Sequence, residues 1–243
     1  MQEQHALTVV LVHGAWADGS SWTKVITSLQ RSNVAVIAAP IPLTSLSDDV
    51  AALDRTIDRI GGPVVLVGHA YAGAVIGAST HSQVRSLVYI AALAPAEGET
   101  VGDVFYRAAP HPAAPELAPD RDGYIWLPVD AFAAAFAQHA SAIEHDLLAA
   151  VQRPIRVDCI QQAVCAPRWK EVPVWYLQAD EDRMIDTSTQ TFMAERMGAH
   201  VRPHRVDHAP LISDPQTVVD VITEAIAATA RIIASQANGA HRG

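Results

Sequence analysis

Short runs of aliphatic and β-branched residues alternate along this chain with segments in which apolar side chains recur every three or four positions. The short runs predict strands at 7–12, 33–39, 63–67, 84–93, 174–178 and 200–206. The helical spacing predicts helices at 21–30, 47–60 and 188–197, one directly after position 70, and a last one from 215 that frays beyond 237. Alternation at this interval predicts an α/β fold with a doubly wound, mostly parallel sheet.

The pattern changes between residues 95 and 172. Prolines crowd the stretch 95–128, and the only clear helical spacing lies at 129–138 and 141–151. A segment of this length is more than a connection, and its aromatic residues indicate an ordered helical lid inserted before the last two strands. We expect its rings to form the wall of a ligand pocket, although a helical excursion without substrate contact is the alternative. The rings are Tyr106, Trp126, Phe132 and Phe136.

Composition favours one domain over 1–243, with a core at about 1–94 and 173–243 and the lid at about 95–172. Half of the 243 residues are hydrophobic and 18% are charged, which fits a sheet covered on both faces. A net charge of -9 argues against nucleic acid and anionic membranes as partners. No stretch approaches the ~20 apolar residues of a membrane span. We therefore expect a cytoplasmic protein that binds a small molecule; a homodimer is compatible with the sequence.

The two cysteines and the histidines have no spacing typical of a zinc site, and two cysteines do not indicate a disulfide framework. The glycines between 68 and 73 lack the dinucleotide-binding spacing, and a P-loop lysine is missing. The sequence therefore predicts neither a metal nor a cofactor.

Residues 63–76 have the layout of a strand, a sharp turn and an apolar helix. The turn reads Gly68-His69-Ala70-Tyr71-Ala72, which corresponds to the nucleophile elbow G-x-S-x-G. Position 70, where the motif has its serine, is an alanine, and an alanine methyl cannot attack a carbonyl. The last glycine of the motif, which is expected to let helix and strand approach closely, is also replaced, by Ala72.

The first strand ends in His13-Gly14-Ala15-Trp16, where small residues interrupt the apolar run. A strand that enters such a loop can point backbone N–H groups at a ligand oxygen. On the elbow template the two oxyanion donors are the amides of Ala15 and Tyr71. His13 and Trp16 are then expected beside the substrate. The alternative is an ordinary turn between strand and helix.

An acid and a histidine follow the last two predicted strands. Asp182 comes after the strand at 174–178 and His208 after the strand at 200–206, so both are expected at the carboxyl edge of the sheet. Asp180, two residues earlier, and Asp207, beside the histidine, are rivals for the acid. Asp207 is a poor partner because consecutive side chains on an extended segment point in opposite directions, and Asp182 is preferred over Asp180. The alternatives are a loop carboxylate paired with Arg183 and a solvated loop histidine.

Together, these motifs resemble the α/β-hydrolase fold family, in particular the small hydrolases related to plant methylesterases and hydroxynitrile lyases. The resemblance covers nearly the whole chain. It rests on the segment 12–16, on the elbow with Tyr71 and Gly73, on Asp182 in Glu-Asp-Arg-Met-Ile, and on His208. It implies a triad in the order nucleophile, acid, histidine, with Ala70 at the nucleophile position.

Two explanations of Ala70 remain open. A serine esterase trapped by a Ser→Ala change accounts for that position alone, whereas the further departure at Ala72 favours a native alanine. We then expect cofactor-free acid/base chemistry on a small apolar carbonyl compound, either hydrolysis by activated water or a lyase or cyclase type of proton transfer. A ligand-binding protein that lost catalysis is the third possibility, but it has no need of His208 and Asp182.

Overall fold

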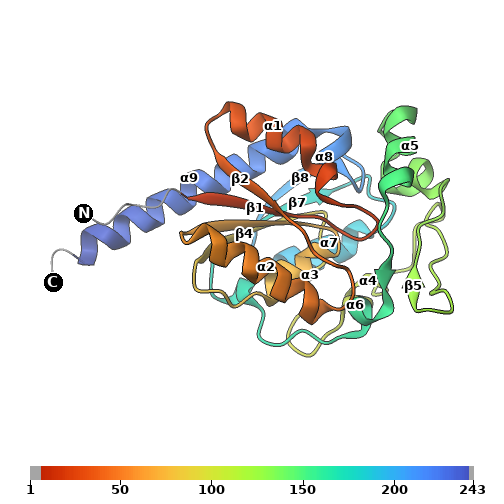
Figure 1. Cartoon of the computed structure of the whole chain (residues 1–243), viewed down its shortest axis with the longest axis horizontal. Helices are drawn as coiled ribbons and strands as arrows, with labels where there is room; N and C mark the ends of the chain where they lie inside the picture. The colour runs from red at the N-terminus through yellow and green to blue at the C-terminus, as the bar shows by residue number, and fades with distance from the viewer. Residues whose placement is uncertain (1–6, 241–243) are drawn as a thin grey trace.

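The computed structural model describes residues 7–240 and has a six-stranded parallel sheet at its centre (Figure 1). The strand order is β2-β1-β3-β4-β7-β8, all neighbours parallel. This confirms the predicted doubly wound parallel sheet. The strands are β1 (Thr8–Val12), β2 (Ala35–Ala39), β3 (Val64–His69), β4 (Val84–Ile90), β7 (Val174–Ala179) and β8 (His200–His204).

Helices cover both faces of the sheet, so that β1 and β3 are buried along their whole length (Figure 1). On one face, α1 (Thr23–Arg31) packs against the long last helix α9 (Pro215–Ala240). On the other lie α2 (Leu46–Ile60), α3 (Ala72–Ala78) and α7 (Thr187–Arg196). The 3₁₀ turn η1 (Gly19–Trp22) precedes α1, and the short α8 (Pro210–Ser213) precedes α9. No helix within 7–240 is both long enough and apolar enough to cross a bilayer.

Local chemistry moved several element ends from their predicted positions. Helix α2 begins one residue early, at Leu46, because the Ser45 side chain accepts from Asp48 N and caps it. It ends at Gly61, whose φ of 68° is easy only for glycine. Helix α9 continues to Ala240, so the fraying predicted from 237 is wrong as far as 240, and 241–243 lie outside the described residues.

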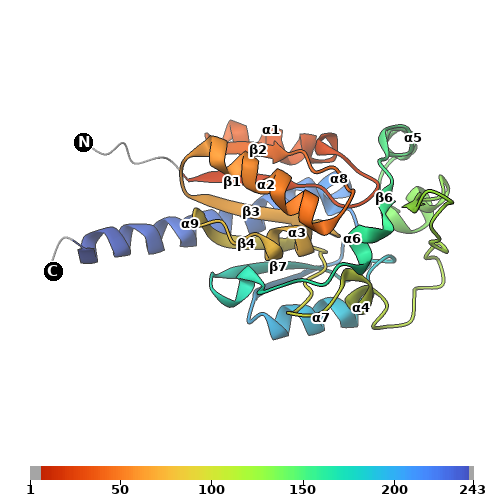
Figure 2. The same ribbon diagram turned by 60° about the horizontal axis from the view of Figure 1, so that its bottom comes forward.

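The segment between β4 and β7 lies at one end of the sheet, as the turned view makes clear (Figure 2). We call residues 95–172 the lid. Its α5 (Ala142–Val151) agrees with the sequence, whereas the helix predicted at 129–138 shrinks to one π-helical turn, η2 (Phe132–Phe136). The other lid elements are α4 (Val101–Phe105), β5 (Tyr124–Ile125), β6 (Ile155–Arg156), α6 (Val157–Gln161) and η3 (Arg168–Lys170). Strands β5 and β6 pair with each other in antiparallel fashion. This pair was not predicted, because a strand of two residues is too short to show an alternating pattern.

Candidate active site

Position 70 has the backbone conformation of a nucleophile elbow even though it carries no nucleophile. Ala70 has a φ of 51°, in the left-handed region that costs a residue with a Cβ roughly 1–2 kcal/mol. The turn is held from both sides, because Ala70 N donates to Ile90 O (3.3 Å) and Leu93 N donates to Ala70 O (3.0 Å). The strained turn therefore directs the methyl of residue 70 into a cavity at the carboxyl edge of the sheet.

Two glycines allow α3 to approach the sheet closely. A Cβ on Gly68 would lie 2.7 Å from Ala72 O, and one on Gly73 would lie closer still to Leu93 O. The sequence interpretation assigned the close approach to the motif glycine that Ala72 replaces. That assignment is wrong: Ala72 is fully buried without difficulty, and Gly68 and Gly73 on either side of it provide the space.

The expected pairing of acid and histidine is confirmed. His208 Nδ1 lies 2.9 Å from Asp182 Oδ2, and both side chains are buried. The other carboxylate oxygen, Oδ1, accepts from Met184 N (2.7 Å) and Ile185 N (2.9 Å). Because Nδ1 donates to the carboxylate, the tautomer leaves Nε2 as the nitrogen able to accept a proton, and His208 lines the cavity beside Ala70.

The rival acids have other partners. Asp180 Oδ1 accepts from Gln178 Nε2 at 3.0 Å on the exposed side of the turn. Asp207 accepts from His139 N (2.9 Å) and Ser213 Oγ (2.6 Å), so it joins the lid to the loop after β8. Neither is hydrogen-bonded to His208.

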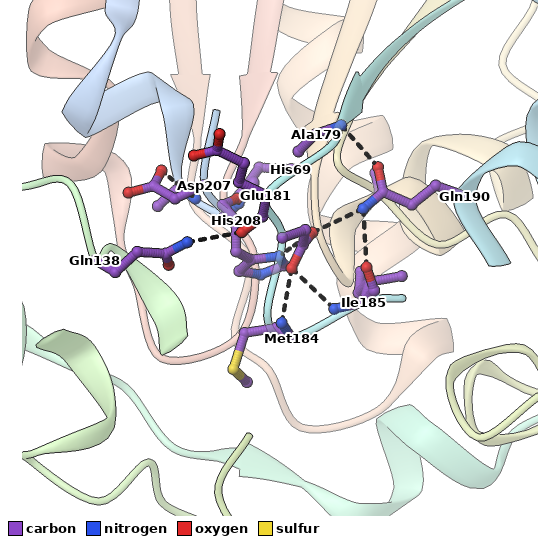
Figure 3. A network of polar contacts seen from close by, with 12 residues as sticks. His69, Gln138, Ala179, Glu181, Met184, Ile185, Gln190, Asp207 and His208 are labelled. Carbon is purple, nitrogen blue, oxygen red and sulfur yellow. Dashed lines mark hydrogen bonds and ion pairs between the residues drawn. The ribbon is translucent and has the colours of Figure 1, made fainter. Parts of the chain in front are cut away.

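Gln190 on α7 completes the site, and sequence reasoning missed it. Its Nε2 donates to Asp182 Oδ2 (2.9 Å) and to Ile185 O (3.0 Å), and its Oε1 accepts from Ala179 N (3.0 Å) (Figure 3). One fully buried amide thus joins the end of β7 to the turn that carries the acid. The sequence signal is faint, since a glutamine in a helix is ordinarily exposed.

His69 is the second residue that sequence reasoning left without a role. Its Nε2 donates to the backbone oxygen of His208 at 2.7 Å, and the two rings lie 4.9 Å apart. Burial, reinforced by the charge of His208, lowers the pKa of His69 to about 3, so this imidazole is neutral. It therefore braces the loop of the base against the elbow without adding a charge.

The cavity between the sheet edge and the lid has a volume of about 60 Å³ and an almost wholly apolar wall. Core and lid contribute equally, and none of the described residues lining it is Ser, Thr, Cys, Lys, Asp or Glu. The wall consists of Ala15, Trp16, Ala70, Tyr71, Leu93, Val101, Phe105, Tyr106, Leu117, Ile125, Phe136, Ile155, Ile160, Met184, Ile185 and His208.

Only two of the four expected lid rings line this cavity, Tyr106 and Phe136. Trp126 is 51% exposed, because Ile125 beside it on the extended chain faces the cavity and consecutive side chains point in opposite directions. Phe132 is buried one turn before Phe136 and packs on it edge to face at 5.4 Å, outside the cavity. The expectations for Trp126 and Phe132 were therefore wrong.

Of the two residues in the loop after β1 that were expected beside the substrate, one lines the cavity and the other does not. Trp16 lines the cavity and its Nε1 donates to Ile125 O at 3.0 Å, which ties the loop to the lid. His13, expected beside the substrate, does not line the cavity: its ring is buried and Nδ1 donates to Gly14 O at 3.0 Å. Burial lowers the pKa of His13, so it is a neutral structural residue.

The two residues predicted to supply the oxyanion donors both lie at the cavity. Ala15 and Tyr71 both line the cavity, and within 7–240 neither amide takes part in a backbone hydrogen bond. The adjacent Trp16 N is occupied, since it donates to Arg153 O at 3.1 Å. A Cβ on Gly14 would meet the Ala70 methyl at 3.0 Å, so the loop lies directly on the elbow. Ala15 and Tyr71 therefore lie at the cavity, as predicted, while their role as oxyanion donors stays a prediction.

Cys159 is not a replacement nucleophile. It lies outside the cavity wall, and its thiol donates to Asp49 Oδ2 at 3.7 Å. Burial, reinforced by the charge of Asp49, raises the pKa of this thiol to about 12. The same carboxylate oxygen accepts from the hydroxyl of Tyr71 (2.7 Å), so Asp49 holds both side chains in place. Among the described residues, no group of three or more His, Cys, Asp or Glu side chains is arranged to hold a metal ion.

Comparisons with known proteins agree with this fold. The family described as "Alpha/beta hydrolase family" matches residues 9–221. A curated relative, "Probable hydrolase R7" of Phoma sp., is 25% identical, with 89% of this chain and 96% of the relative covered.

Solved structures of similar fold include a pyrethroid hydrolase from Sphingobium faniae JZ-2. It has a TM-score of 0.78 and 19% identity over 93% of this chain and 100% of that one. A methylesterase from Arabidopsis has a TM-score of 0.75 and 16% identity over 91% and 99% of the two chains. At these identities the likeness supports the fold alone.

Proposed function

The chain belongs to the alpha/beta hydrolase family, and from this we propose that it is a hydrolase-like enzyme that works without a serine nucleophile. In this proposal His208 is a general base oriented by Asp182, and the amides of Ala15 and Tyr71 form the oxyanion hole. The substrate is a small apolar carbonyl compound. We also propose a cytoplasmic location and no cofactor.

The observation that carries the proposal is the intact base in an apolar cavity without a nucleophile. Burying a histidine and a carboxylate is costly unless every polar atom is satisfied. Here Asp182 accepts from His208, from Gln190 and from two backbone amides, while His208 keeps Nε2 for the cavity. A protein that only binds an apolar ligand gains nothing from this arrangement, whereas proton transfer requires it.

Two reactions use these groups without a covalent intermediate. In hydrolysis, His208 Nε2 takes a proton from a water molecule as its oxygen attacks the carbonyl carbon, and then returns the proton to the leaving oxygen or sulfur. In a lyase or cyclase reaction, Nε2 takes a proton from the substrate itself, and the amides hold the resulting oxyanion or enolate. General base catalysis contributes about 10²–10⁴-fold to the rate, and an oxyanion donor about 10²–10³-fold.

The test compares the parent protein with His208→Ala, Asp182→Asn and Ala70→Ser on activated esters, lactones and thioesters. A second assay measures the exchange of α-protons of simple ketones with deuterated water. We expect the parent to turn over a member of this panel or to catalyse exchange, and His208→Ala to abolish that activity. His204→Ala, at a histidine of β8 outside the cavity, is the matched control.

Mass spectrometry distinguishes the remaining outcome. A silent parent, together with an Ala70→Ser variant that hydrolyses esters in a burst and carries an acyl group on the new serine, would establish a disarmed serine esterase and overturn the proposal. If neither the parent nor any variant is active but a ligand still binds, the protein is a non-catalytic member of the fold.

A further inference from the structure

A second cavity, of about 400 Å³, adjoins the inner one described above. The two share four lining residues, Phe105, Tyr106, Leu117 and Met184. These side chains form the boundary between the cavities. Tyr106 is 58% exposed and lies edge to face on Phe105, with the ring centroids 4.9 Å apart. The Tyr106 ring therefore lies between the two cavities with one side in contact with solvent.

The wall of the outer cavity differs from that of the inner one. Small alanines and prolines of the lid, within 108–118, make up half of its lining residues, and its charged side chains are Glu116 and Asp186. Asp186 is fixed, since its Oδ1 accepts from Ser188 N at 2.9 Å as the cap of α7. The two arginines that adjoin wall residues along the chain are not in the wall: Arg107 stacks on the Phe192 ring at 3.9 Å, and Arg183 donates to Ala134 O at 2.8 Å. The wall of the outer cavity is therefore mixed, with more apolar than polar surface and with negative charge.

We propose that the outer cavity is the second part of the substrate site, and that the substrate is an elongated apolar compound with a neutral or cationic far end. Its carbonyl end passes Tyr106 into the inner cavity beside His208, and its far end stays in the outer cavity near Glu116 and Asp186. The identity of the reacting end rests on the proposed function, whereas the two-part binding does not require turnover.

The volumes support an elongated shape. An inner cavity of about 60 Å³ accepts a small headgroup, while the outer one has room for a chain or ring system. Each methylene removed from water contributes about 0.8 kcal/mol, which is about fourfold in affinity. Affinity should therefore rise with chain length well beyond what the inner cavity alone holds. A carboxylate at the far end would be repelled by the two acids, which act in a partly desolvated site.

The probes are methyl ketones from 2-butanone to 2-undecanone, which have no ester or thioester bond to hydrolyse. The longest chain is also made with a terminal trimethylammonium or carboxylate group. Binding is measured by calorimetry on the parent and on His208→Ala. We expect affinity to rise up to about fourfold per methylene, and the ammonium probe to bind about tenfold or more tightly than the carboxylate probe at low salt.

Variants locate the effect. Ala114→Trp, which fills the outer cavity, should weaken 2-undecanone by about tenfold or more and leave 2-butanone unchanged. Glu116→Lys leaves one cation beside the remaining Asp186 and should abolish the preference between the charged probes. Glu195→Lys makes the same charge change at an exposed position of α7 outside both cavities and should leave that preference intact. Thermal unfolding checks that each variant is folded, and the probe series on the parent stands without any variant.

A plateau of affinity at the shortest ketones would overturn the inference, as would equal binding of the two charged probes. The proposed function fails separately. If chain length governs binding in both the parent and His208→Ala but nothing is turned over, the two-part site is supported and the proposed catalysis by His208 is contradicted. If turnover requires His208 while chain length has no effect on binding, the proposed catalysis is supported and the two-part site is contradicted.

Discussion

At the scale of single residues, Ala70 has the strained backbone of a nucleophile elbow but lacks the serine hydroxyl that such a turn ordinarily carries. Its φ of 51° is a conformation that glycine adopts without cost and alanine does not. The hydrogen bonds to Ile90 and from Leu93 hold the turn whichever residue occupies position 70. The conformation therefore belongs to the strand–turn–helix unit and not to the side chain at its centre.

Replacing Ala70 with glycine should leave the free energy of unfolding almost unchanged, because relief of the left-handed strain offsets the greater freedom of glycine in the unfolded chain. Ala74→Gly, four residues on in the buried helix α3, should lower it by at least about 1 kcal/mol through helix propensity and a lost methyl. Urea unfolding of both variants measures the contrast. Equal losses at the two positions would show that Ala70 is unstrained.

His69 makes stability depend on pH. Its pKa falls from 6.5 to about 3 on folding, so between these values the unfolded chain binds a proton that the folded chain does not. The contribution is complete above pH 6.5, and the free energy of unfolding then drops by about 1.4 kcal/mol per pH unit as the pH falls toward 3. His69→Gln should reduce this slope, measured by urea unfolding from pH 7 down to about pH 4. The matched control is His111→Gln, on the exposed lid surface, and an unchanged slope in His69→Gln would contradict the assignment.

At the scale of elements, the turn from β7 to α7 is built around one carboxylate. Asp182 receives the amides at the start of the turn, and α7 returns Gln190 to the other oxygen (Figure 3). Helix α7 therefore does more than cover the sheet. Through Gln190 it holds Asp182 in place, and Asp182 in turn orients His208. Gln190 is a positioning residue, since its contacts are with Asp182 and the backbone and it does not line the cavity.

Gln190→Leu should reduce kcat by about 10–100-fold with little change in KM, because the acid loses a donor and shifts while the cavity wall is intact. The free energy of unfolding should fall by about 1–3 kcal/mol, since Ala179 N and Ile185 O lose their partner. Gln178→Leu removes the corresponding amide beside Asp180 and should leave kcat unchanged. The dependence of kcat on pH separates the two effects: a purely structural loss would lower stability without moving that profile.

At the scale of the whole molecule, the lid carries most of the exposed apolar surface. Of the seven large hydrophobic side chains that are exposed in the described part of the chain, five lie within 95–172. Ile143 and Leu147 are one turn apart on α5, which stands at the periphery of the fold (Figure 1). A patch of this kind fits contact between copies, in which the same helix face meets its equivalent across a two-fold axis.

We expect the protein to be a homodimer joined through α5, as light scattering after gel filtration would reveal by a mass twice the 26.0 kDa of the chain. Ile143→Glu and Leu147→Glu should each shift the protein toward the monomer. Ile232→Glu, an exposed apolar position on α9, is the control. A parent that elutes as a monomer at all concentrations would contradict this prediction.

Patterns within the chain determined the strands, most helices and the order of the chemical groups. The spacing of hydrophobic residues reveals buried strands and amphipathic helices. Asp182 and His208 each follow a predicted strand, and parallel strands end at the same edge of the sheet, so the two residues could be expected close together. The same local logic identified the elbow around Ala70, whose conformation depends on neighbours within a few residues.

Only the tertiary structure decided which lid rings reach the cavity, that Gln190 and His69 brace the acid and the base, and that Gly68 and Gly73 take the close approach assigned to position 72. Each of these depends on contacts between segments far apart in the chain. The energies that select them come from burial and from satisfying buried polar atoms, and neither has a local period that a sequence can display.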